Sequence, residues 1–154
     1  MPKYEFRYPS VDASEEKMLD DVLAVLVQNG VDKDLQDGFL LAVSEAFTNA
    51  LIHGNQLKPD RTIKVLVDIN NETLLADIID EGQGGLDKIK HRRPPTLFSE
   101  GGRGVDLMKY YASDVKFTET EMGGLRVSIR FDAKKKSRRK FHIVECGGYH
   151  GNHR

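Results

Sequence analysis

The stretch Leu41–Asn55, with the sequence LAVSEAFTNALIHGN, constrains the fold most, because its apolar and polar side chains separate at helical spacing. At about 100° per residue, apolar side chains gather on one side of a helix: Leu40, Val43, Phe47, Ala50 and Leu51. Glu45, Asn49 and His53 follow one another on the other side, each four residues after the last. The stretch therefore predicts a helix that buries one side and offers a carboxylate, an amide and an imidazole on the other.

The polar side of this helix carries groups that can move protons and bind metals. A carboxylate can take a proton from an attacking group, and an amide oxygen suits Mg²⁺, which prefers oxygen ligands in octahedral geometry. The alternative is a surface helix whose polar side is only solvated. The helix alone leaves both interpretations open, so the decision depends on the rest of the chain.

The chain has 154 residues, of which 39% are hydrophobic and 31% are charged. These values are ordinary for one soluble domain with its own core. Met1–Pro9 contains no apolar segment typical of signal peptides, and the longest apolar run, Val22–Val27, is far shorter than a membrane span. A single cysteine, Cys146, excludes an internal disulfide framework. We therefore expect a cytoplasmic protein.

Charge divides the chain into an acidic body and a basic tail. Residues 134–154 carry seven Lys or Arg and one acid, whereas residues 1–133 carry 16 basic and 23 acidic side chains. An acidic body disfavours broad nucleic-acid binding, which needs a basic surface. We expect residues 1–133 to form one domain and residues 134–154 a solvated tail, with contact between the basic run 134–140 and an acidic partner or nucleic acid as the alternative. The tail contains possible zinc ligands, but their spacing is unlike that of common zinc modules: His142, Cys146, His150 and His153.

Apolar spacing also predicts the order of strands and helices. Strands are expected at residues 3–8, 63–69, 74–80, 115–117 and 125–131. Helices are expected from Ser14 to Asn29, from Asp32 or Asp34 to a stop at Gly54-Asn55, and from Gly104 to Ala112. Residues 81–102 lack apolar periodicity, and a loop of this length in a compact domain is usually functional or mobile. This order predicts an α+β two-layer sandwich, a mixed and largely antiparallel sheet with helices on one face.

Asp80 would stand at the end of a strand, followed by Gly82 and Gly84 in a D-x-G-x-G pattern. A buried carboxylate can accept a hydrogen bond from an exocyclic amino group such as that of adenine. Glycines let the backbone run close to a ligand, because they lack a Cβ and tolerate positive φ. By itself the pattern is also that of an ordinary turn.

A third feature, GGRG at residues 101–104, precedes the expected helix that begins at Gly104. Free N–H groups and the positive end of the helix dipole form a phosphate site, and Arg103 can add a charge-assisted hydrogen bond. The alternative is a glycine-rich turn with no ligand. The chain contains neither the P-loop motif G-x-x-x-x-G-K-[ST] nor the protein-kinase motifs, so those two classes are excluded.

Together, E-x-x-x-N-A-x-x-H-G, D-x-G-x-G and G-x-G occur in an order that resembles the N, G1 and G2 boxes of one ATPase superfamily. That superfamily contains gyrase, heat-shock chaperone, histidine-kinase and mismatch-repair proteins. The small size, the first strand with two helices, and the wording S-E-A-x-x-N-A-x-x-H-G resemble one branch, the bacterial anti-sigma-factor serine kinases. The resemblance covers about residues 4–131. It implies the histidine-kinase-like ATP-binding fold, with ATP and Mg²⁺ as cofactors.

The resemblance also implies roles for individual residues. Glu45 matches the general base, Asn49 the Mg²⁺-binding amide, and Asp80 the acid that reads adenine. Residues 85–100 match the ATP lid. His53 is a candidate nucleotide contact, with packing against the lid as the alternative. The remaining implied nucleotide-binding positions are the glycines beneath the base and the phosphate loop with its arginine: Gly82, Gly84, Gly102, Arg103 and Gly104.

Two positions depart from the family pattern. Gly124 is followed by Leu125, where relatives often carry a threonine that reaches toward the acid or the adenine. The missing hydroxyl predicts weaker nucleotide binding. Glu100 stands where some relatives have a basic residue near the terminal phosphate, and Arg103 or the pair Arg92 and Arg93 can replace that charge. ATP binding is therefore the firmer expectation, and kinase turnover the weaker one.

Three functions follow from the resemblance. The first is a Mg-ATP-dependent serine kinase that phosphorylates an anti-anti-sigma protein, sequesters a sigma factor and forms a homodimer. The second is an ATP-binding regulatory module with little or no kinase activity. The third is a detached histidine-kinase catalytic domain, which is disfavoured because no dimerisation helix with a phospho-accepting histidine precedes the expected ATP site. Phosphorylation of a partner on serine, on histidine, or not at all separates the three.

Overall fold

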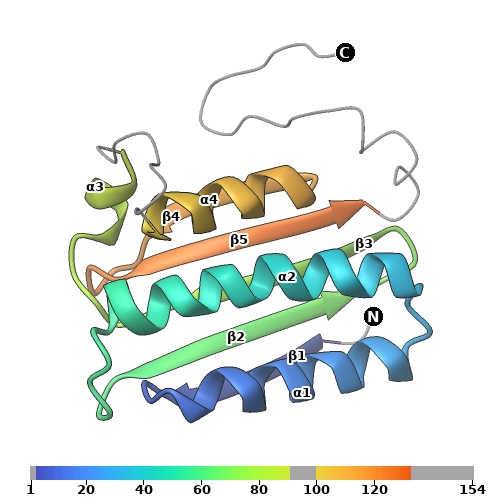
Figure 1. Cartoon of the computed structure of the whole chain (residues 1–154), viewed down its shortest axis with the longest axis horizontal. Coiled ribbons are helices and arrows are strands. Elements are labelled where there is room, and N and C mark those ends of the chain that lie inside the picture. The colour runs from blue at the N-terminus through green and yellow to red at the C-terminus, as the bar shows by residue number, and fades with distance from the viewer. Residues whose placement is uncertain (1–2, 91–99, 133–154) are drawn as a thin grey trace.

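The computed structural model describes residues 3–90 and 100–132, which form a sheet of strands with helices across one face (Figure 1). The strands are β1 (Lys3–Pro9), β2 (Thr62–Ile69), β3 (Thr73–Ile79), β4 (Asp114–Glu119) and β5 (Leu125–Asp132). The helices are α1 (Ala13–Gln28), α2 (Lys33–Asn49), the π-helical turn η1 (Ala50–Gly54), α3 (Gly85–Lys90) and α4 (Glu100–Tyr111). The strand order is β1-β2-β3-β5-β4, with antiparallel pairing between all neighbours.

The strands form where the sequence alternates, because one face of the sheet is buried and the other is not. In β2, Ile63, Val65, Val67 and Ile69 face the core, and the residues between them are only half-buried. β3 pairs with β2 so that Val65 lies opposite Ile78, which keeps both apolar sets on the same face. The expected α+β two-layer sandwich, with a largely antiparallel sheet and helices on one face, is confirmed.

The helices α1, α2 and α4 supply the other side of the core. The apolar stripe predicted on α1 is buried: Met18, Val22, Val25 and Leu26. On α2, Phe39 packs edge-on against Phe131 of β5, with 5.5 Å between the ring centroids. Near the end of α2, Phe47 packs edge-on against Tyr8 of β1. The two ends of α2 are thus anchored to opposite halves of the sheet.

Four expectations need correction. The sheet is not mixed, since all the strand pairs within the described residues are antiparallel. The segment 81–102 is not wholly irregular, because α3 occupies Gly85–Lys90. The last helix begins at Glu100, so the GGRG segment occupies its second to fifth residues rather than a loop before it. The second helix changes at Asn49 from α-helical to the wider π-helical turn η1.

Some expectations lie outside the described residues. These are the central part of the lid with Arg92 and Arg93, and the tail at residues 134–154. Among the helices of the described segments, none combines the length and the apolar character needed to cross a bilayer.

Candidate functional site

One end of the molecule collects the segments that carry the three sequence motifs. In Figure 1 the end of α2 with η1, the start of β5, α3 and the start of α4 all lie at the left. The end of β3 is held in the same place, because Asp80 donates its backbone N–H to the carbonyl of Leu125, the first residue of β5 (3.1 Å). The antiparallel order of β3 and β5 makes this meeting necessary, since β3 ends where β5 begins.

Asp80 is the buried acid at the centre of this end, with 5% of its surface exposed. Its Oδ1 accepts hydrogen bonds from the backbone N–H groups of Gly82 (2.9 Å) and Leu125 (3.0 Å). Within the described chain, no donor is bonded to Oδ2. Burial raises the pKa of the Asp80 carboxyl, and the two backbone donors and the charges of Lys88 and Arg61 oppose that rise. Among the described residues the carboxyl is therefore fixed through Oδ1, while Oδ2 lies beside Gly54.

Glycines surround Asp80 because larger residues would not fit. A Cβ on Gly54 would overlap the Asp80 carboxylate, and a Cβ on Gly82 would overlap the backbone carbonyl of Gly54. On the opposite side, a Cβ on Gly124 would overlap the backbone carbonyl of Asp80. Three chain segments thus approach one carboxylate at backbone distance, which only glycine permits.

A second turn closes this region from the other side. Gln83 donates from its side-chain amide to the backbone carbonyl of Met122 (2.8 Å). The residue after Gln83, Gly84, has φ +70°, a left-handed conformation that suits glycine. The D-x-G-x-G turn is therefore tied to the loop that leads into β5.

Asn55 is a functional candidate that the sequence interpretation passed over, since it was taken only as the stop of a helix. Its side chain is fully buried, with no exposed surface. The side-chain Nδ2 donates to Ser10 Oγ (2.8 Å) and to the carbonyl of Thr62 (3.1 Å), and Oδ1 accepts from the N–H of Glu81 (2.7 Å). The only sign of this buried, hydrogen-bonded amide in the sequence is that Asn55 directly follows Gly54.

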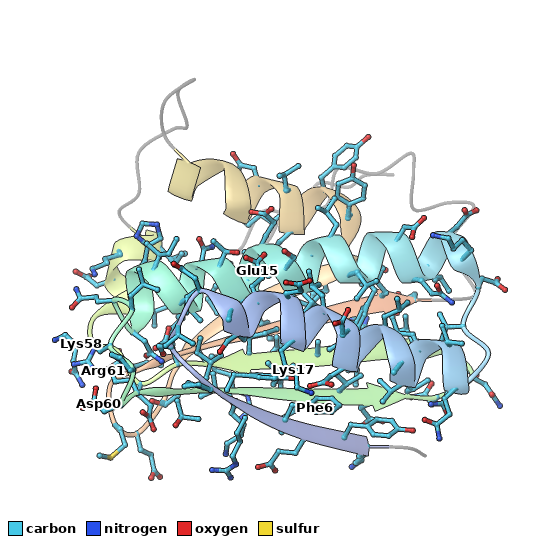
Figure 2. All side chains as sticks on the ribbon, turned by 60° about the horizontal axis from the view of Figure 1, so that its bottom comes forward. Phe6, Glu15, Lys17, Lys58, Asp60 and Arg61 are labelled. Atoms are coloured by element: carbon cyan, nitrogen blue, oxygen red, sulfur yellow. The ribbon has the colours of Figure 1, made fainter. Side chains whose placement is uncertain are left out.

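Glu45 and Asn49 are both half-buried on α2. Burial raises the pKa of the Glu45 carboxyl, and the nearby charge of Glu15 on α1 raises it further. The Glu15 carboxylate accepts hydrogen bonds from two hydroxyl groups of α2, Ser44 Oγ (2.8 Å) and Thr48 Oγ1 (3.3 Å). Figure 2 shows Glu15 on the side of α1 that faces α2. Neither Glu45 nor Asn49 makes a side-chain hydrogen bond to another of the described residues.

The other predicted site residues differ in how they are placed. His53, in η1, is exposed. Gly102, Arg103 and Gly104 are the third, fourth and fifth residues of α4, which packs beside α2. A helix leaves only the N–H groups at its very start without internal partners, so Gly102 keeps such a group and Gly104, expected in a loop, does not. The Arg103 side chain lies outside what the structure describes.

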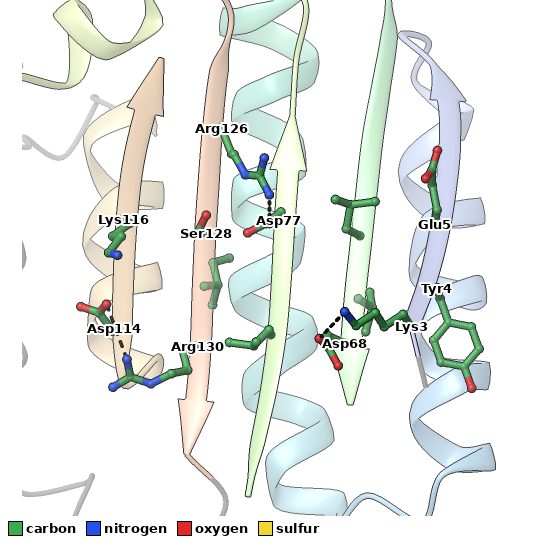
Figure 3. Close-up of a pocket in the computed structure, with 14 residues that line it drawn as sticks. Lys3, Tyr4, Glu5, Asp68, Asp77, Asp114, Lys116, Arg126, Ser128 and Arg130 are labelled. Atoms are coloured by element: carbon green, nitrogen blue, oxygen red, sulfur yellow. Dashed lines mark hydrogen bonds and ion pairs between the residues drawn. The ribbon is translucent and has the colours of Figure 1, made fainter. Parts of the chain in front are cut away.

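A cavity of about 680 Å³ lies on the helix-free face of the sheet (Figure 3). Six of its charged side chains form ion pairs with one another: Arg126 with Asp77, Arg130 with Asp114, and Lys3 with Asp68. Asp77 and Asp80 lie on the same segment but on opposite sides of the sheet, as the alternating burial along β3 requires. This cavity is thus separate from the site around Asp80.

No group of three or more His, Cys, Asp or Glu side chains placed to hold a metal ion exists within residues 3–90 and 100–132. A cation in this site would therefore need most of its ligands from elsewhere. A bound triphosphate supplies such oxygens, and the free amide oxygen of Asn49 can add one from the protein. The donor set thus fits a metal that arrives with a nucleotide, and does not fit a metal held by protein ligands alone.

An α+β sandwich with a helix-borne Glu and Asn, a buried strand-end Asp and a glycine-rich helix start defines a class, the histidine-kinase-like ATPases. Residues 9–131 match the family described as Histidine kinase-like ATPase domain. The chain therefore belongs to this family.

Two relatives place the chain in the branch of this family that contains the anti-sigma F factors. It is 34% identical over 93 residues to the anti-sigma F factor of Halalkalibacterium halodurans, a match covering 57% of this chain and 63% of that protein. It is 30% identical over 115 residues to the anti-sigma F factor of Heyndrickxia coagulans, covering 71% of this chain and 78% of that protein. The first match thus spans less than two thirds of its relative.

Among solved structures, the chain is similar to one that contains the RsbU and RsbW domains of a Mycobacterium tuberculosis protein. The TM-score is 0.60 at 17% sequence identity, and the match covers 85% of this chain and 32% of that one. At this identity the likeness concerns the fold. It agrees with the two-layer arrangement described above.

Proposed function

We propose that this chain binds Mg-ATP at the Asp80 end of the sheet and transfers the terminal phosphoryl group to a serine of a small protein partner. In this proposal the chain is also an anti-sigma factor that sequesters a sigma factor when the partner is phosphorylated. The observation that carries the proposal is the packing of Gly54, at the end of the helix with Glu45 and Asn49, against the buried Asp80 carboxylate.

The adenine base is the part of ATP that Asp80 suits. Its Oδ1 is held by the N–H groups of Gly82 and Leu125, which leaves Oδ2 to accept a hydrogen bond from an exocyclic amino group. A buried acceptor that finds its partner only in the ligand discriminates strongly against bases that present a carbonyl there. The site should therefore prefer adenine to guanine.

The phosphate end would be held by two elements. Asn49 offers its amide oxygen to the metal, and the first turn of α4, which contains Gly102, offers backbone N–H groups and the positive end of the helix dipole. Gly104, the fifth residue of the helix, lies beyond that turn. Arg103 in the same turn would add a positive charge. Phosphoryl transfer depends chiefly on such positioning and on neutralisation of charge.

Glu45 would act as the general base. Bound Mg-ATP supplies an electrophilic terminal phosphorus and a diphosphate leaving group. The serine hydroxyl of the partner would attack that phosphorus while Glu45 takes the hydroxyl proton, so that one P–O bond forms as another breaks. Burial and the charge of Glu15 raise the pKa of Glu45, which makes it a stronger base than an exposed carboxylate.

A second candidate function is ATP binding with little turnover. Leu125 favours it, because the position after Gly124 contributes only its backbone N–H to Asp80 and no side-chain hydroxyl. In this case the chain would be a regulator that responds to nucleotide and holds a sigma factor without modifying a partner. The resemblance implies a homodimer and a cytoplasmic location for either function.

The experiment is a titration of the full chain with ATP in the presence of Mg²⁺, for wild type and Asn49→Ala. Incubation with an anti-anti-sigma protein from the same genome and detection of phosphoserine would follow. We expect saturable binding, weaker in Asn49→Ala, and phosphoserine on the partner. Binding without phosphoserine supports the second candidate, phosphohistidine supports a histidine kinase, and an absence of nucleotide binding contradicts the proposal.

A further inference from the structure

Asn55 joins four segments of the chain at the end of the sheet that holds Asp80. It follows η1 directly, and its bonds reach Ser10 after β1, Thr62 at the start of β2, and Glu81 after β3. Ser10 Oγ in turn donates to the carbonyl of Arg61 (2.8 Å), next to Thr62. The side chain of Asn55 is thus the shared partner of segments that are distant in sequence.

The bond to Glu81 bears directly on the nucleotide site. The N–H of Glu81 belongs to the residue that follows Asp80, and it donates to Asn55 Oδ1 at 2.7 Å. Glu81 is fixed a second time, because its Oε1 accepts from the N–H of Thr62 (2.8 Å). The peptide between Asp80 and Glu81 therefore has its orientation set by Asn55, and the Asp80 side chain departs from that same peptide.

We infer that Asn55 is a positioning residue that sets the orientation of the Asp80 carboxylate and thereby the preference of the site for adenine over guanine. The inference rests on the proposed function, in which Asp80 reads the base. Asn55 does not touch the ligand in this account. It acts through the Glu81 peptide, and the bonds from Gly82 and Leu125 to Asp80 Oδ1 transmit the orientation.

The geometry explains why an amide is required here. Asn55 must donate twice, to Ser10 Oγ and the Thr62 carbonyl, and accept once, from Glu81. Only a side chain with both NH₂ and C=O groups does this at that length. Removing it would leave the Glu81 N–H without its buried acceptor, a loss comparable to a hydrogen bond of a buried polar group.

The test compares Asn55→Ala with Tyr8→Phe in the full chain. Tyr8→Phe also removes a side-chain hydrogen bond, the partly buried one from Tyr8 to Asp21 Oδ2 (2.7 Å). That bond joins β1 to α1 and does not involve Glu81. Amide hydrogen exchange is measured at Glu81, Gly82 and Leu125, relative to Val65 in β2 as the reference for global opening. The affinities for ATP and GTP are measured with Mg²⁺ present.

We expect exchange at those three amides to rise about ten-fold in Asn55→Ala, and the preference for ATP over GTP to fall by a similar factor. Tyr8→Phe should change neither the exchange at those amides nor the preference for ATP, even if its melting temperature falls as much as that of Asn55→Ala. Unchanged exchange in Asn55→Ala would overturn the inference, as would faster exchange with an unchanged preference. If wild type binds neither nucleotide, the proposed function fails, while the exchange rates still decide whether Asn55 positions Asp80.

Asn55→Asp keeps the test decisive if Asn55→Ala does not fold. Aspartate has the same length, keeps Oδ1 for the Glu81 N–H, and loses the two donor bonds to Ser10 and Thr62. The inference predicts that Asn55→Asp has a lower melting temperature than wild type but a preference for ATP within about two-fold of it, because the bond from the Glu81 N–H to Oδ1 is kept. Loss of that preference in Asn55→Asp would contradict the role assigned to the Glu81 bond.

Discussion

Gly54 lies so close to Asp80 that a Cβ on the glycine would overlap the carboxylate of the acid. The two residues are 26 positions apart, one at the end of the helical segment 33–54 and the other after β3. Their contact brings the polar side of α2, with Glu45 and Asn49, to the same end of the sheet as the buried acid. This meeting of segments is the structural basis of the proposed ATP site.

Gly82→Ala should disrupt that meeting. A Cβ at Gly82 would overlap the backbone carbonyl of Gly54, and backbone cannot move aside as a flexible side chain can. We expect a loss of at least about 2 kcal/mol in the free energy of unfolding, together with loss of ATP binding. Urea denaturation and ATP titration measure both.

Gly30→Ala is the matched control for that change. Gly30 has φ +71° and follows α1, but a Cβ there would meet nothing within 4 Å. It should cost about 1 kcal/mol through left-handed strain alone and leave ATP binding intact. If Gly82→Ala and Gly30→Ala lowered the free energy of unfolding equally and both still bound ATP, the close packing at Gly82 would be contradicted.

Asp80→Asn should stabilise the nucleotide-free protein at neutral pH. Burial raises the pKa of Asp80, so the stability that this group contributes is full at low pH and is lost as pH rises through its folded-state pKa. Each pKa unit corresponds to about 1.4 kcal/mol. The melting temperature of Asp80→Asn should therefore exceed that of wild type at pH 7, by a margin that shrinks toward low pH. A variant less stable than wild type at pH 7 would argue against this account.

Glu45→Gln should abolish transfer without abolishing binding. Glutamine keeps the size of the side chain and removes its basicity, so we expect serine phosphorylation to slow by roughly 100-fold or more with little change in ATP affinity. Because the pKa of Glu45 is raised, the wild-type rate should increase with pH through a midpoint above that of an ordinary carboxylate. Asp37→Asn, an exposed change on the same helix, serves as control, and equal rates in the two variants would remove Glu45 from the mechanism.

Tyr8→Phe should weaken the attachment of α1 to the sheet. The buried Tyr8 hydroxyl donates to Asp21, and its loss should cost about 1 kcal/mol in thermal or chemical unfolding. Burial alone would raise the pKa of Asp21, but hydrogen bonds from Tyr8 and Lys17 hold it below its usual value. The stability due to Asp21 is therefore present above its unfolded-state pKa and is lost as pH falls through the folded-state pKa. This loss on acidification should be smaller in Tyr8→Phe, and an unchanged acid dependence would contradict the assignment.

Most of the fold could be predicted from the sequence, because one buried face imposes a simple period on strands and helices. The strand ends and the helix stripes follow directly from residues such as Ile63, Val65 and Met18, which are buried as their spacing requires. The short helix α3 could not be predicted in this way, since none of its residues is fully buried and it carries no complete apolar stripe. The apolar spacing of a sequence reflects which side chains are buried, so a short exposed helix such as α3 shows no such spacing.

The candidate site was predicted in part. Asp80 was placed correctly at a strand end and is buried, and Glu45 and Asn49 share a half-buried helix side, although their roles stay predictions. Asn55 was missed because a polar residue after a glycine ordinarily marks a helix end. Its importance comes from bonds to Ser10, Thr62 and Glu81, and contacts between such distant positions carry no local signal.

The most direct test of the central claim is an isothermal titration of Mg-ATP into wild type, Asp80→Asn and Asp77→Asn. Asp77 lies three residues before Asp80 but on the helix-free face, where it pairs with Arg126. Asp77→Asn is therefore the same chemical change as Asp80→Asn, made outside the proposed ATP site. The account predicts saturable binding in wild type and Asp77→Asn, and binding weaker by at least about ten-fold in Asp80→Asn. Equal affinity in all three proteins would contradict it.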